Sequence, residues 1–210
     1  MTKKRIFMKR RGSLEEKSLK SYLDLRIRIC PRGIYMSKIE IEKIDITRLE
    51  TDAIVNAANE GLLQGGGVCG AIFRIAGADK LTAACSLIGH CATGQAVITP
   101  GFDLPAKHII HAVGPIWRGG KNHEPELLYS AYKSSLNVAM ENDCHSIGFP
   151  LISAGIYGYP LSGAWQQALK ACSDFITEYS DYEMNIVFAV LDEKIMNIGL
   201  EILVDNTLPT

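Results

Sequence analysis

Long hydrophobic runs are missing from this sequence. None of its segments approaches the ~20 consecutive apolar residues that cross a bilayer. The first residues are charged and do not resemble the apolar core of a secretion signal. These absences argue against a membrane protein, and we expect a cytoplasmic chain with no membrane partner.

Cysteine is too sparse for a disulfide scaffold or a zinc ribbon. The chain has six cysteines, without paired spacing, at positions 30, 69, 85, 91, 144 and 172. We expect reduced thiols, mostly in the core. The cluster Cys85, His90 and Cys91 lacks a second pair of ligands at finger-like spacing. We therefore predict neither a metal site nor a cofactor.

An excess of charge of one sign is also lacking. The 22 basic and 23 acidic residues leave a net charge of −1, which disfavours nucleic-acid binding by the body of the protein. The exception is the N-terminus, where six of the basic residues fall within twelve positions: Lys3, Lys4, Arg5, Lys9, Arg10 and Arg11. This stretch is either a solvated tail, which we favour, or a nucleic-acid-binding arm.

The chain divides into a short extension and one domain. Residues 1–35 form a basic extension with room for one short helix, for which Ser13 and Glu16 fit a capping box. Residues 36–210 suit a single well-cored domain. Strand patterns occur at 38–43, 53–57, 95–99, 108–113, 146–152 and 185–190. Helix patterns occur at 68–75, 80–88, 124–142, 163–179 and 193–204.

Alternation of strands and helices predicts an α/β fold with three layers. Most strands are apolar enough for burial on both faces, which is typical of a mixed, mostly parallel central sheet with helices on both faces. In such sheets, ligands bind outside the carboxyl ends of the strands. The informative residues should therefore lie just after strands.

The first such loop contains three consecutive glycines, Gly65, Gly66 and Gly67, after the 53–57 strand. Without Cβ atoms, the backbone N–H groups of this loop can turn toward an anion. A helix beginning near Val68 adds its positive dipole end. The loop is therefore predicted to cradle a phosphate or a diphosphate.

The second loop follows the 146–152 strand and precedes a helix that we expect to be capped near Ser162. It contains small residues and glycines over 153–160, together with Tyr157. Two such loops facing each other would clamp a diphosphate, with Tyr157 packed against a sugar. The alternative is a pair of ordinary strand-to-helix turns, but two glycine loops with an Asn pair and a Tyr favour the phosphate site.

Asn56 and Asn59 stand at the end of an apolar strand, where amides are costly unless they are hydrogen-bonded. They either tie loops together or contact the hydroxyls of a ligand. We expect structural bonding for Asn56 and ligand contact for Asn59.

Other nucleotide-binding motifs match less well. Gly65, Gly67 and Gly70 satisfy G-x-G-x-x-G, but they lie well past the strand, and His90 stands where a dinucleotide fold needs an acid. No Gly-Lys-Ser/Thr follows the glycines, which argues against a P-loop. A Rossmann dehydrogenase and a P-loop enzyme are both disfavoured.

Several strings together resemble the macro-domain family, in its order and spacing, from about residue 38 to the C-terminal helix. They are Asp45-Ile46-Thr47, residues 52–59, 65–70, 111–115 and 153–158. The resemblance is greatest to the MacroD type, which includes bacterial O-acetyl-ADP-ribose deacetylases and mono-ADP-ribosyl hydrolases. It implies that ADP-ribose, O-acetyl-ADP-ribose or ADP-ribosylated protein is the partner.

The resemblance also implies roles for individual residues. Asp45 should accept a hydrogen bond from the adenine amino group, with Ile46 beside the ring, and Asn59 should hold the distal ribose. Ligand-binding positions are Asp45, Ile46, Asn56, Gly65, Gly66, Gly67, Val68, Ser153, Ala154, Gly155, Ile156 and Tyr157. Catalytic positions are Asn59, Cys69 and Tyr157.

Cys69 departs from the MacroD pattern, in which an Asp at this position assists the attacking water. Gly-Val-Cys resembles alphavirus macro domains, which hydrolyse ADP-ribosyl linkages without that acid. Cys69 is either a small residue tolerated at a crowded helix start or a ligand contact. His108 and His111 lie on a strand and are expected to pack or hydrogen-bond rather than act as bases.

The predicted function is binding of ADP-ribose and hydrolysis of ADP-ribosyl esters by substrate-assisted attack of water. The alternative is a non-catalytic ADP-ribose reader.

Overall fold

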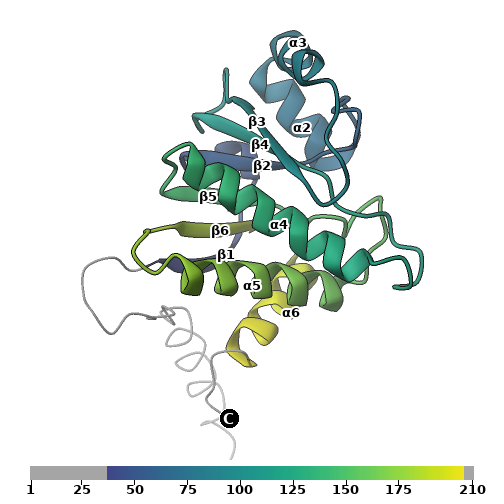
Figure 1. Cartoon of the computed structure of the whole chain (residues 1–210), viewed down its shortest axis with the longest axis vertical. Helices are drawn as coiled ribbons and strands as arrows, with labels where there is room; N and C mark the ends of the chain where they lie inside the picture. The colour runs from purple at the N-terminus through teal and green to yellow at the C-terminus, as the bar shows by residue number, and fades with distance from the viewer. Residues whose placement is uncertain (1–36, 206–210) are drawn as a thin grey trace, which may run out of the picture.

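The computed structural model describes residues 37–205 (Figure 1). The strands are β1 (Lys38–Lys43), β2 (Ala53–Ala57), β3 (Ala96–Pro100), β4 (His108–Ala112), β5 (Ser146–Phe149) and β6 (Asn185–Val190). The helices are η1 (Ile46–Arg48, a 3-10 turn), α2 (Gly67–Ala76), α3 (Ala78–Ile88), α4 (Glu124–Glu141), α5 (Leu161–Glu178) and α6 (Glu193–Asp205). The extension predicted at 1–35, its short helix and Cys30 lie outside the described residues.

The six strands form one sheet in the order β1-β6-β5-β2-β4-β3. All neighbouring strands run parallel except β3, which is antiparallel to β4. This confirms the expected mixed, mostly parallel sheet. The inner strands are largely buried, whereas the edge strands β1 and β3 keep partly exposed positions, so the expectation of two-sided burial holds only for the inner strands.

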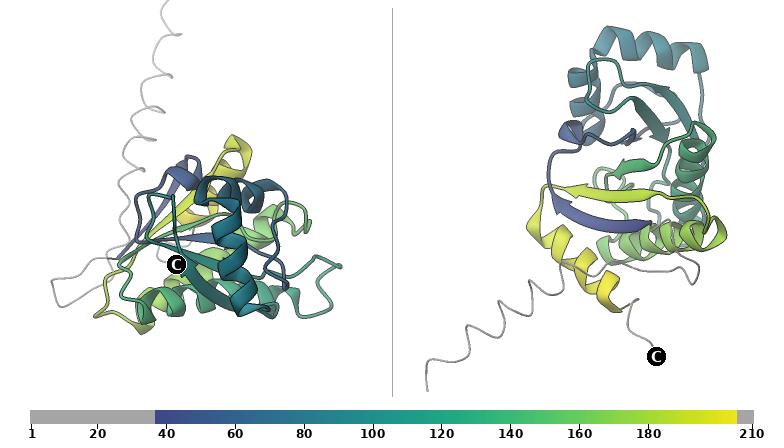
Figure 2. Two further views of the ribbon diagram at one scale, coloured as in Figure 1. Left: turned by 90° about the horizontal axis from the view of Figure 1, so that it is seen from above. Right: turned by 90° about the vertical axis from the view of Figure 1, so that its left-hand side faces the viewer.

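Helices cover both faces of the sheet, which confirms the three-layer prediction (Figure 2). Consecutive side chains of a strand point to opposite faces. Val55 packs with α4 and α5, whereas its neighbour Ile54 packs with η1, α2 and α3. Helix α6 packs against α5 and β1. Across 37–205, none of the helices is both long and apolar enough to span a bilayer.

The described cysteines bear out the expectation of core thiols. All five are free and buried: Cys69, Cys85, Cys91, Cys144 and Cys172.

Two sequence-based boundaries are wrong around the second loop. Strand β5 ends at Phe149 rather than at residue 152. Pro150 has no N–H to donate, and beyond Phe149 the hydroxyl of buried Tyr132 of α4 takes the place of strand-to-strand hydrogen bonds. The Tyr132 hydroxyl accepts a hydrogen bond from Ile152 N at 2.8 Å and donates to Pro150 O at 3.3 Å. Helix α5 begins at Leu161 with Pro160 as its N-cap, so Ser162 lies inside the first turn and does not cap it.

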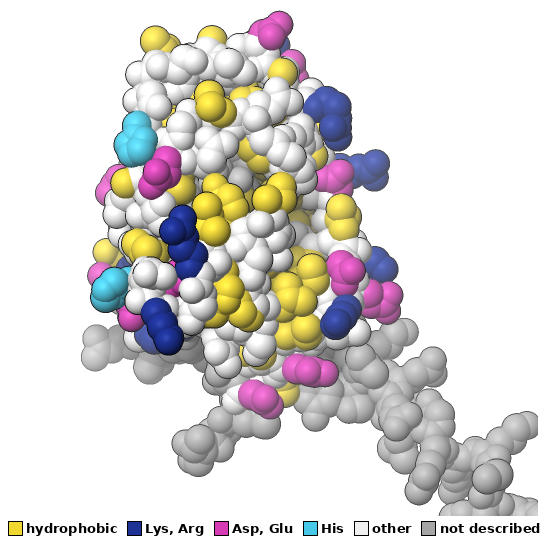
Figure 3. All heavy atoms as spheres, turned by 90° about the vertical axis from the view of Figure 1, so that its right-hand side faces the viewer, with side chains coloured by type: hydrophobic (Ala, Val, Ile, Leu, Met, Phe, Trp, Pro, Cys, Tyr) yellow, Lys and Arg dark blue, Asp and Glu magenta, His cyan; other side chains and the backbone are white. Residues whose placement is uncertain are grey.

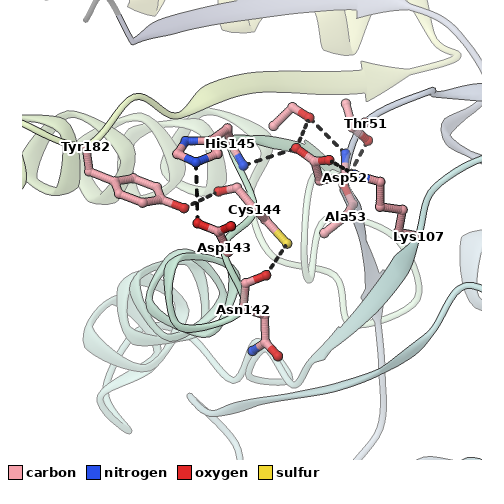
Figure 4. Close-up of polar contacts among 10 residues, drawn as sticks. Thr51, Asp52, Ala53, Lys107, Asn142, Asp143, Cys144, His145 and Tyr182 are labelled. Atoms are coloured by element: carbon pink, nitrogen blue, oxygen red, sulfur yellow. Dashed lines mark hydrogen bonds and ion pairs between the residues drawn. The ribbon is translucent and has the colours of Figure 1, made fainter.

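A polar network joins the amino ends of three strands (Figure 4). Asp52, just before β2, accepts hydrogen bonds from Lys107 Nζ at 2.8 Å, Ser146 Oγ at 2.8 Å and His145 N at 3.1 Å. Lys107 precedes β4, and Ser146 begins β5. One carboxylate therefore connects the starts of β2, β4 and β5, at the sheet edge opposite the two glycine loops.

Replacing Asp52 with asparagine is expected to reduce the free energy of unfolding by about 1–2 kcal/mol at neutral pH, because charged hydrogen bonds are lost at a partly exposed site. Burial raises the pKa of Asp52, but the bonds from Lys107, Ser146 and His145 N outweigh it and lower the pKa below its ordinary 3.8. The contribution is therefore present above pH 3.8 and disappears as the pH falls through the folded-state pKa. Urea denaturation of both proteins across acidic pH should show the difference shrinking. A constant difference would contradict this assignment.

Candidate ligand site at the carboxyl edge

The loops after β2 and β5 separate because of the way the fold connects these two strands. These strands are neighbours in the sheet, but the helix after β2 lies on one face and the helix after β5 lies on the other. Their loops therefore diverge at the carboxyl edge, on the right in Figure 1. A divergence of this kind is where open α/β sheets bind ligands.

The first loop leads into α2 without a capping side chain. Gly66 is the N-cap, and Gly67 has a φ of +58°, which favours glycine. A Cβ on Gly70 would lie 2.7 Å from Gly65 O, so the loop folds tightly back on the helix. Cys69 Sγ accepts a hydrogen bond from Gly65 N at 3.4 Å. The first N–H groups of α2 are thus left for an anion rather than for a side chain.

The second loop contains a strained residue with an unpaired hydroxyl. Ser153 has a φ of +64° and is only 6% exposed. Its Oγ is buried without a hydrogen-bond partner among the described residues. Tyr159 N donates to Ser153 O at 3.0 Å and helps to hold this conformation. Backbone strain together with an unpaired polar atom is typical of a binding site.

The two loops face each other, as predicted. A Cβ on Gly66 would lie 3.5 Å from Ile156 Cδ1 of the opposite loop. Cβ atoms on Gly67, Gly155 and Gly158 would meet nothing within 4 Å. Glycines from both loops therefore border open space, into which their main-chain groups can reach.

A third loop, between β4 and α4, supports the second, and sequence reasoning did not anticipate it. Trp117 N donates to Tyr157 O at 2.9 Å, and the Trp117 ring packs on Tyr159 with centroids 4.5 Å apart. A Cβ on Gly114 would lie 2.2 Å from Ser153 Oγ. Gly114 belongs to a string that supported the family resemblance, but the sequence assigned it no role.

A buried carboxylate organises this third loop. Glu124 is 2% exposed and accepts hydrogen bonds from Arg118 N at 2.9 Å, Gly120 N at 3.3 Å and Asn122 N. Burial raises the pKa of Glu124, but the N–H donors of Asn122 and Arg118 outweigh it and hold the pKa at about 2. Glu124 is therefore ionised at neutral pH, and its hydrogen bonds hold the third loop in the conformation that contacts the second loop.

The two asparagines differ in what their amides contact. Asn59 bonds within its own loop, where Nδ2 donates to Leu63 O at 2.8 Å and Oδ1 accepts from Leu63 N at 3.0 Å. Asn56 is 1% exposed, and its Nδ2 lies 3.1 Å from His111 Nδ1. The expected structural bond of Asn56 and the hydrogen-bonding role of His111 are confirmed. Ligand contact by Asn59 stays a prediction and requires opening of the two bonds to Leu63.

Tyr157 of the second loop is a candidate hydrogen-bond donor. Burial raises the pKa of its hydroxyl, and the negative charge of Glu60 raises it further. Tyr157 is thus protonated at neutral pH and available as a hydrogen-bond donor. The predicted catalytic positions come from different segments, since Cys69 lies in the first turn of α2 and Tyr157 in the second loop.

Asp45 and Ile46 occupy the loop after β1. Asp45 Oδ1 accepts hydrogen bonds from Thr47 N at 3.0 Å and Thr47 Oγ1 at 2.8 Å, which caps η1. The sequence did not predict this 3-10 turn. Ile46 is 4% exposed and packs in the core beneath η1. Asp45 Oδ2 takes no part in this cap. The predicted hydrogen bond from the adenine amino group would therefore go to Oδ2.

Exposed apolar side chains gather around the same edge. Figure 3 views this edge and shows hydrophobic side chains over its centre, with charged side chains mainly toward the rim. Four large exposed residues each follow a parallel strand: Leu63, Ile116, Ile156 and Leu191. The edge therefore offers apolar contacts beside the polar main chain of the loops.

Replacing Tyr132 with phenylalanine is expected to cost about 1–3 kcal/mol of unfolding free energy, because buried Ile152 N and Pro150 O lose their partner. The matched control is Tyr129→Phe on the same helix, which breaks a partly exposed bond to Asp174 and should cost less. Urea denaturation measures both. Equal losses would contradict the role given to Tyr132 in ending β5.

Comparison with known proteins agrees with this geometry. The Macro domain family model matches residues 55–168. The O-acetyl-ADP-ribose deacetylase of Salmonella gallinarum is 51% identical over 162 residues, which cover 75% of this chain and 89% of that protein. A macro domain-containing protein of Lactiplantibacillus plantarum is 47% identical over 163 residues, covering 78% of this chain and 94% of that protein.

Solved structures show the same similarity. The Oceanobacillus iheyensis macrodomain with ADP superposes with a TM-score of 0.76 at 37% identity, covering 83% of this chain and 96% of that one. The Trypanosoma brucei macrodomain in complex with ADP-ribose gives a TM-score of 0.73 at 38% identity, covering 79% of this chain and 68% of that one. Sequence, fold and loop geometry agree, and this chain belongs to the macro domain family.

Proposed function

We propose that this protein binds ADP-ribose at its carboxyl edge and hydrolyses ADP-ribosyl esters, with O-acetyl-ADP-ribose as a substrate. The observation that supports this most directly is the pair of facing glycine loops, each leading into a helix without a capping side chain. Main-chain N–H groups at two helix starts favour a diphosphate. Relatives about 50% identical are named O-acetyl-ADP-ribose deacetylase, which supports the ester chemistry.

The hydrolysis needs little beyond binding and orientation. A water between the α-phosphate and the distal ribose attacks the ester carbonyl carbon, and a phosphate oxygen takes the proton. The ester C–O bond then breaks, the ribose oxygen is protonated, and acetate and ADP-ribose leave. The N–H groups of the loops offset the charge of the diphosphate, and Tyr157 is placed to contact the ribose.

Turnover should be modest because the loops provide no strong base. Position 69 is a cysteine, and Glu60 of the first loop accepts hydrogen bonds from Thr93 Oγ1 at 2.7 Å and Thr93 N at 3.1 Å. These bonds lower the pKa of Glu60 and hence its basicity. A positioned general base typically contributes ~10²–10⁴-fold to the rate.

A non-catalytic reader is the second candidate, favoured by the cysteine at position 69. Titration calorimetry with ADP-ribose tests the shared binding site first. Incubation with O-acetyl-ADP-ribose then separates the two candidates, because product formation supports the hydrolase. Binding without product supports the reader, and absence of binding contradicts both.

Mono-ADP-ribosylated protein is the finer part of the proposal. The exposed apolar residues around the carboxyl edge, such as Ile116 and Ile156, support it because they suit contact with a polypeptide next to the bound sugar. A cytoplasmic location is also part of the proposal, and the buried free thiols support it because they suit a reducing compartment.

Asn59→Ala and Asp45→Asn should separate turnover from binding. Asn59→Ala is expected to lower kcat about 10-fold, the equivalent of one orienting hydrogen bond. Asp45→Asn keeps an oxygen for the Thr47 cap but loses the carboxylate, so it should weaken ADP-ribose binding with kcat little changed. Steady-state kinetics and calorimetry measure both variants. The reverse pattern would contradict the assigned roles.

A further inference from the structure

Two cations of the third loop, residues 113–123, have no carboxylate partner. Arg118 and Lys121 are exposed, and within residues 37–205 neither side chain takes part in a hydrogen bond or an ion pair. Most cations of the chain differ in this respect. Six of the eight described lysines are paired with a carboxylate: Lys38, Lys43, Lys80, Lys107, Lys133 and Lys170.

The carboxylate next to this loop does not neutralise the two cations. Glu124 is buried, and its oxygens accept hydrogen bonds from the main-chain N–H groups of Arg118, Gly120 and Asn122. The carboxylate is thus used to fix the loop and not to pair with the Arg118 guanidinium. Glu126, in the first turn of α4, makes no ion pair with Arg118 or Lys121. The loop therefore presents two cations that are unpaired within the described part of the chain.

The third loop is held in place beside the second loop. Trp117 N donates to Tyr157 O at 2.9 Å. The Trp117 ring packs on Tyr159 with centroids 4.5 Å apart, and a Cβ on Gly120 would lie 2.9 Å from the same ring. A loop that is already ordered in this way loses little conformational freedom when it binds a partner. Its cations therefore lie beside the proposed ADP-ribose site on a preformed support.

Exposed aliphatic side chains accompany the cations. Ile116 of the third loop is 51% exposed, and Ile156 of the second loop is 83% exposed. Aliphatic and cationic groups on adjoining loops suit a polypeptide that carries carboxylates. A single-stranded nucleic acid would instead need an aromatic face on which to stack its bases, and the Trp117 ring is already packed on Tyr159. An acidic polypeptide is therefore the better fit.

We propose that the third loop is the contact surface for an acidic polypeptide that carries ADP-ribose, with Arg118 and Lys121 pairing with carboxylates that flank the modified residue. The inference rests on the proposed function and deepens it, because it names the charge of the protein substrate. The ADP-ribose occupies the two glycine loops, and the adjoining polypeptide lies over the third loop. Exposed ion pairs add little affinity individually, but they select one polypeptide over another.

Two peptides test this, each joined to ADP-ribose through a link that resists hydrolysis, with either glutamates or glutamines on both sides of the modified residue. In calorimetry at low salt, the glutamate peptide should bind about fivefold more tightly than the glutamine peptide, as expected for two exposed ion pairs. Screening should reduce this preference at high salt. The double variant Arg118→Gln and Lys121→Gln should lose the preference, with its affinity for free ADP-ribose little changed.

The matched control is the double variant Arg48→Gln and Arg74→Gln. It removes the same charge from two exposed arginines that have no ion pair within residues 37–205, and it should retain the preference. Equal affinities of the unmodified protein for the two peptides, or an equal loss of preference in both double variants, overturns the inference. Tighter binding of ADP-ribose joined to a short oligothymidylate than of the glutamate peptide overturns the assignment to a polypeptide.

Calorimetry with free ADP-ribose separates failure of the proposed function from failure of this inference. If the unmodified protein does not bind ADP-ribose, both are contradicted. Binding of ADP-ribose without a preference between the two peptides contradicts the inference alone.

Discussion

Gly155→Ala is expected to lower the affinity for ADP-ribose by about 10–100-fold, equivalent to ~1.4–2.8 kcal/mol. The second loop would then hold a methyl group where the diphosphate needs the main chain. A Cβ at this position meets no protein atom within 4 Å, so it projects into open space at the second loop. The methyl group would prevent the backbone N–H groups from approaching the phosphate oxygens closely.

The same substitution should leave folding intact, which makes it a clean test. Gly155 is not among the residues with positive φ, so alanine brings no backbone strain there. Gly67→Ala provides the contrast, because its φ of +58° adds a folding cost of about 1 kcal/mol to any loss of binding. Calorimetry and thermal denaturation measure both variants. Full affinity in a folded Gly155→Ala protein would place the diphosphate elsewhere.

The sequence predicted the parts of the fold that depend on local pattern. Strands β1, β2 and β6 begin and end at the predicted residues, because β1 alternates charged residues with isoleucine and the other two are short, largely apolar runs. The end of β5 could not be predicted, since it depends on a hydroxyl from Tyr132, a residue of another element. The cap of α5 was also misplaced, because Ser162 looked like a capping residue while Pro160 occupied that position.

The candidate site likewise has features that local sequence patterns predict and features that they do not. The glycine loops were predictable, because consecutive glycines after a strand have a local physical meaning. The support from Glu124 and Trp117 was not, since it rests on contacts between loops that are distant in the sequence. The pairing of Asn56 with His111 spans 55 positions and appears only once β2 and β4 are side by side. A single sequence therefore predicts the two glycine loops but not the residues that hold them in place.

Cys69→Asp is expected to raise kcat for O-acetyl-ADP-ribose by ~10²-fold, the lower end of what a positioned general base contributes. Position 69 is the third residue of α2, and its Sγ already accepts a hydrogen bond from Gly65 N. A carboxylate there can accept the same bond and is favoured at a helix N-terminus. The added negative charge faces the diphosphate, so KM should rise as kcat rises.

Cys69→Asn is the matched control, because asparagine has the size and the hydrogen-bonding oxygen of aspartate without its basicity. If the carboxylate takes the proton of the attacking water, only the aspartate variant gains turnover, and its kcat falls when the pH drops below the pKa of the new acid. The asparagine variant should also keep a lower KM, since it adds no charge beside the phosphates. Equal kcat values for both variants would mean that position 69 only shapes the loop, and that the water is activated by the substrate alone.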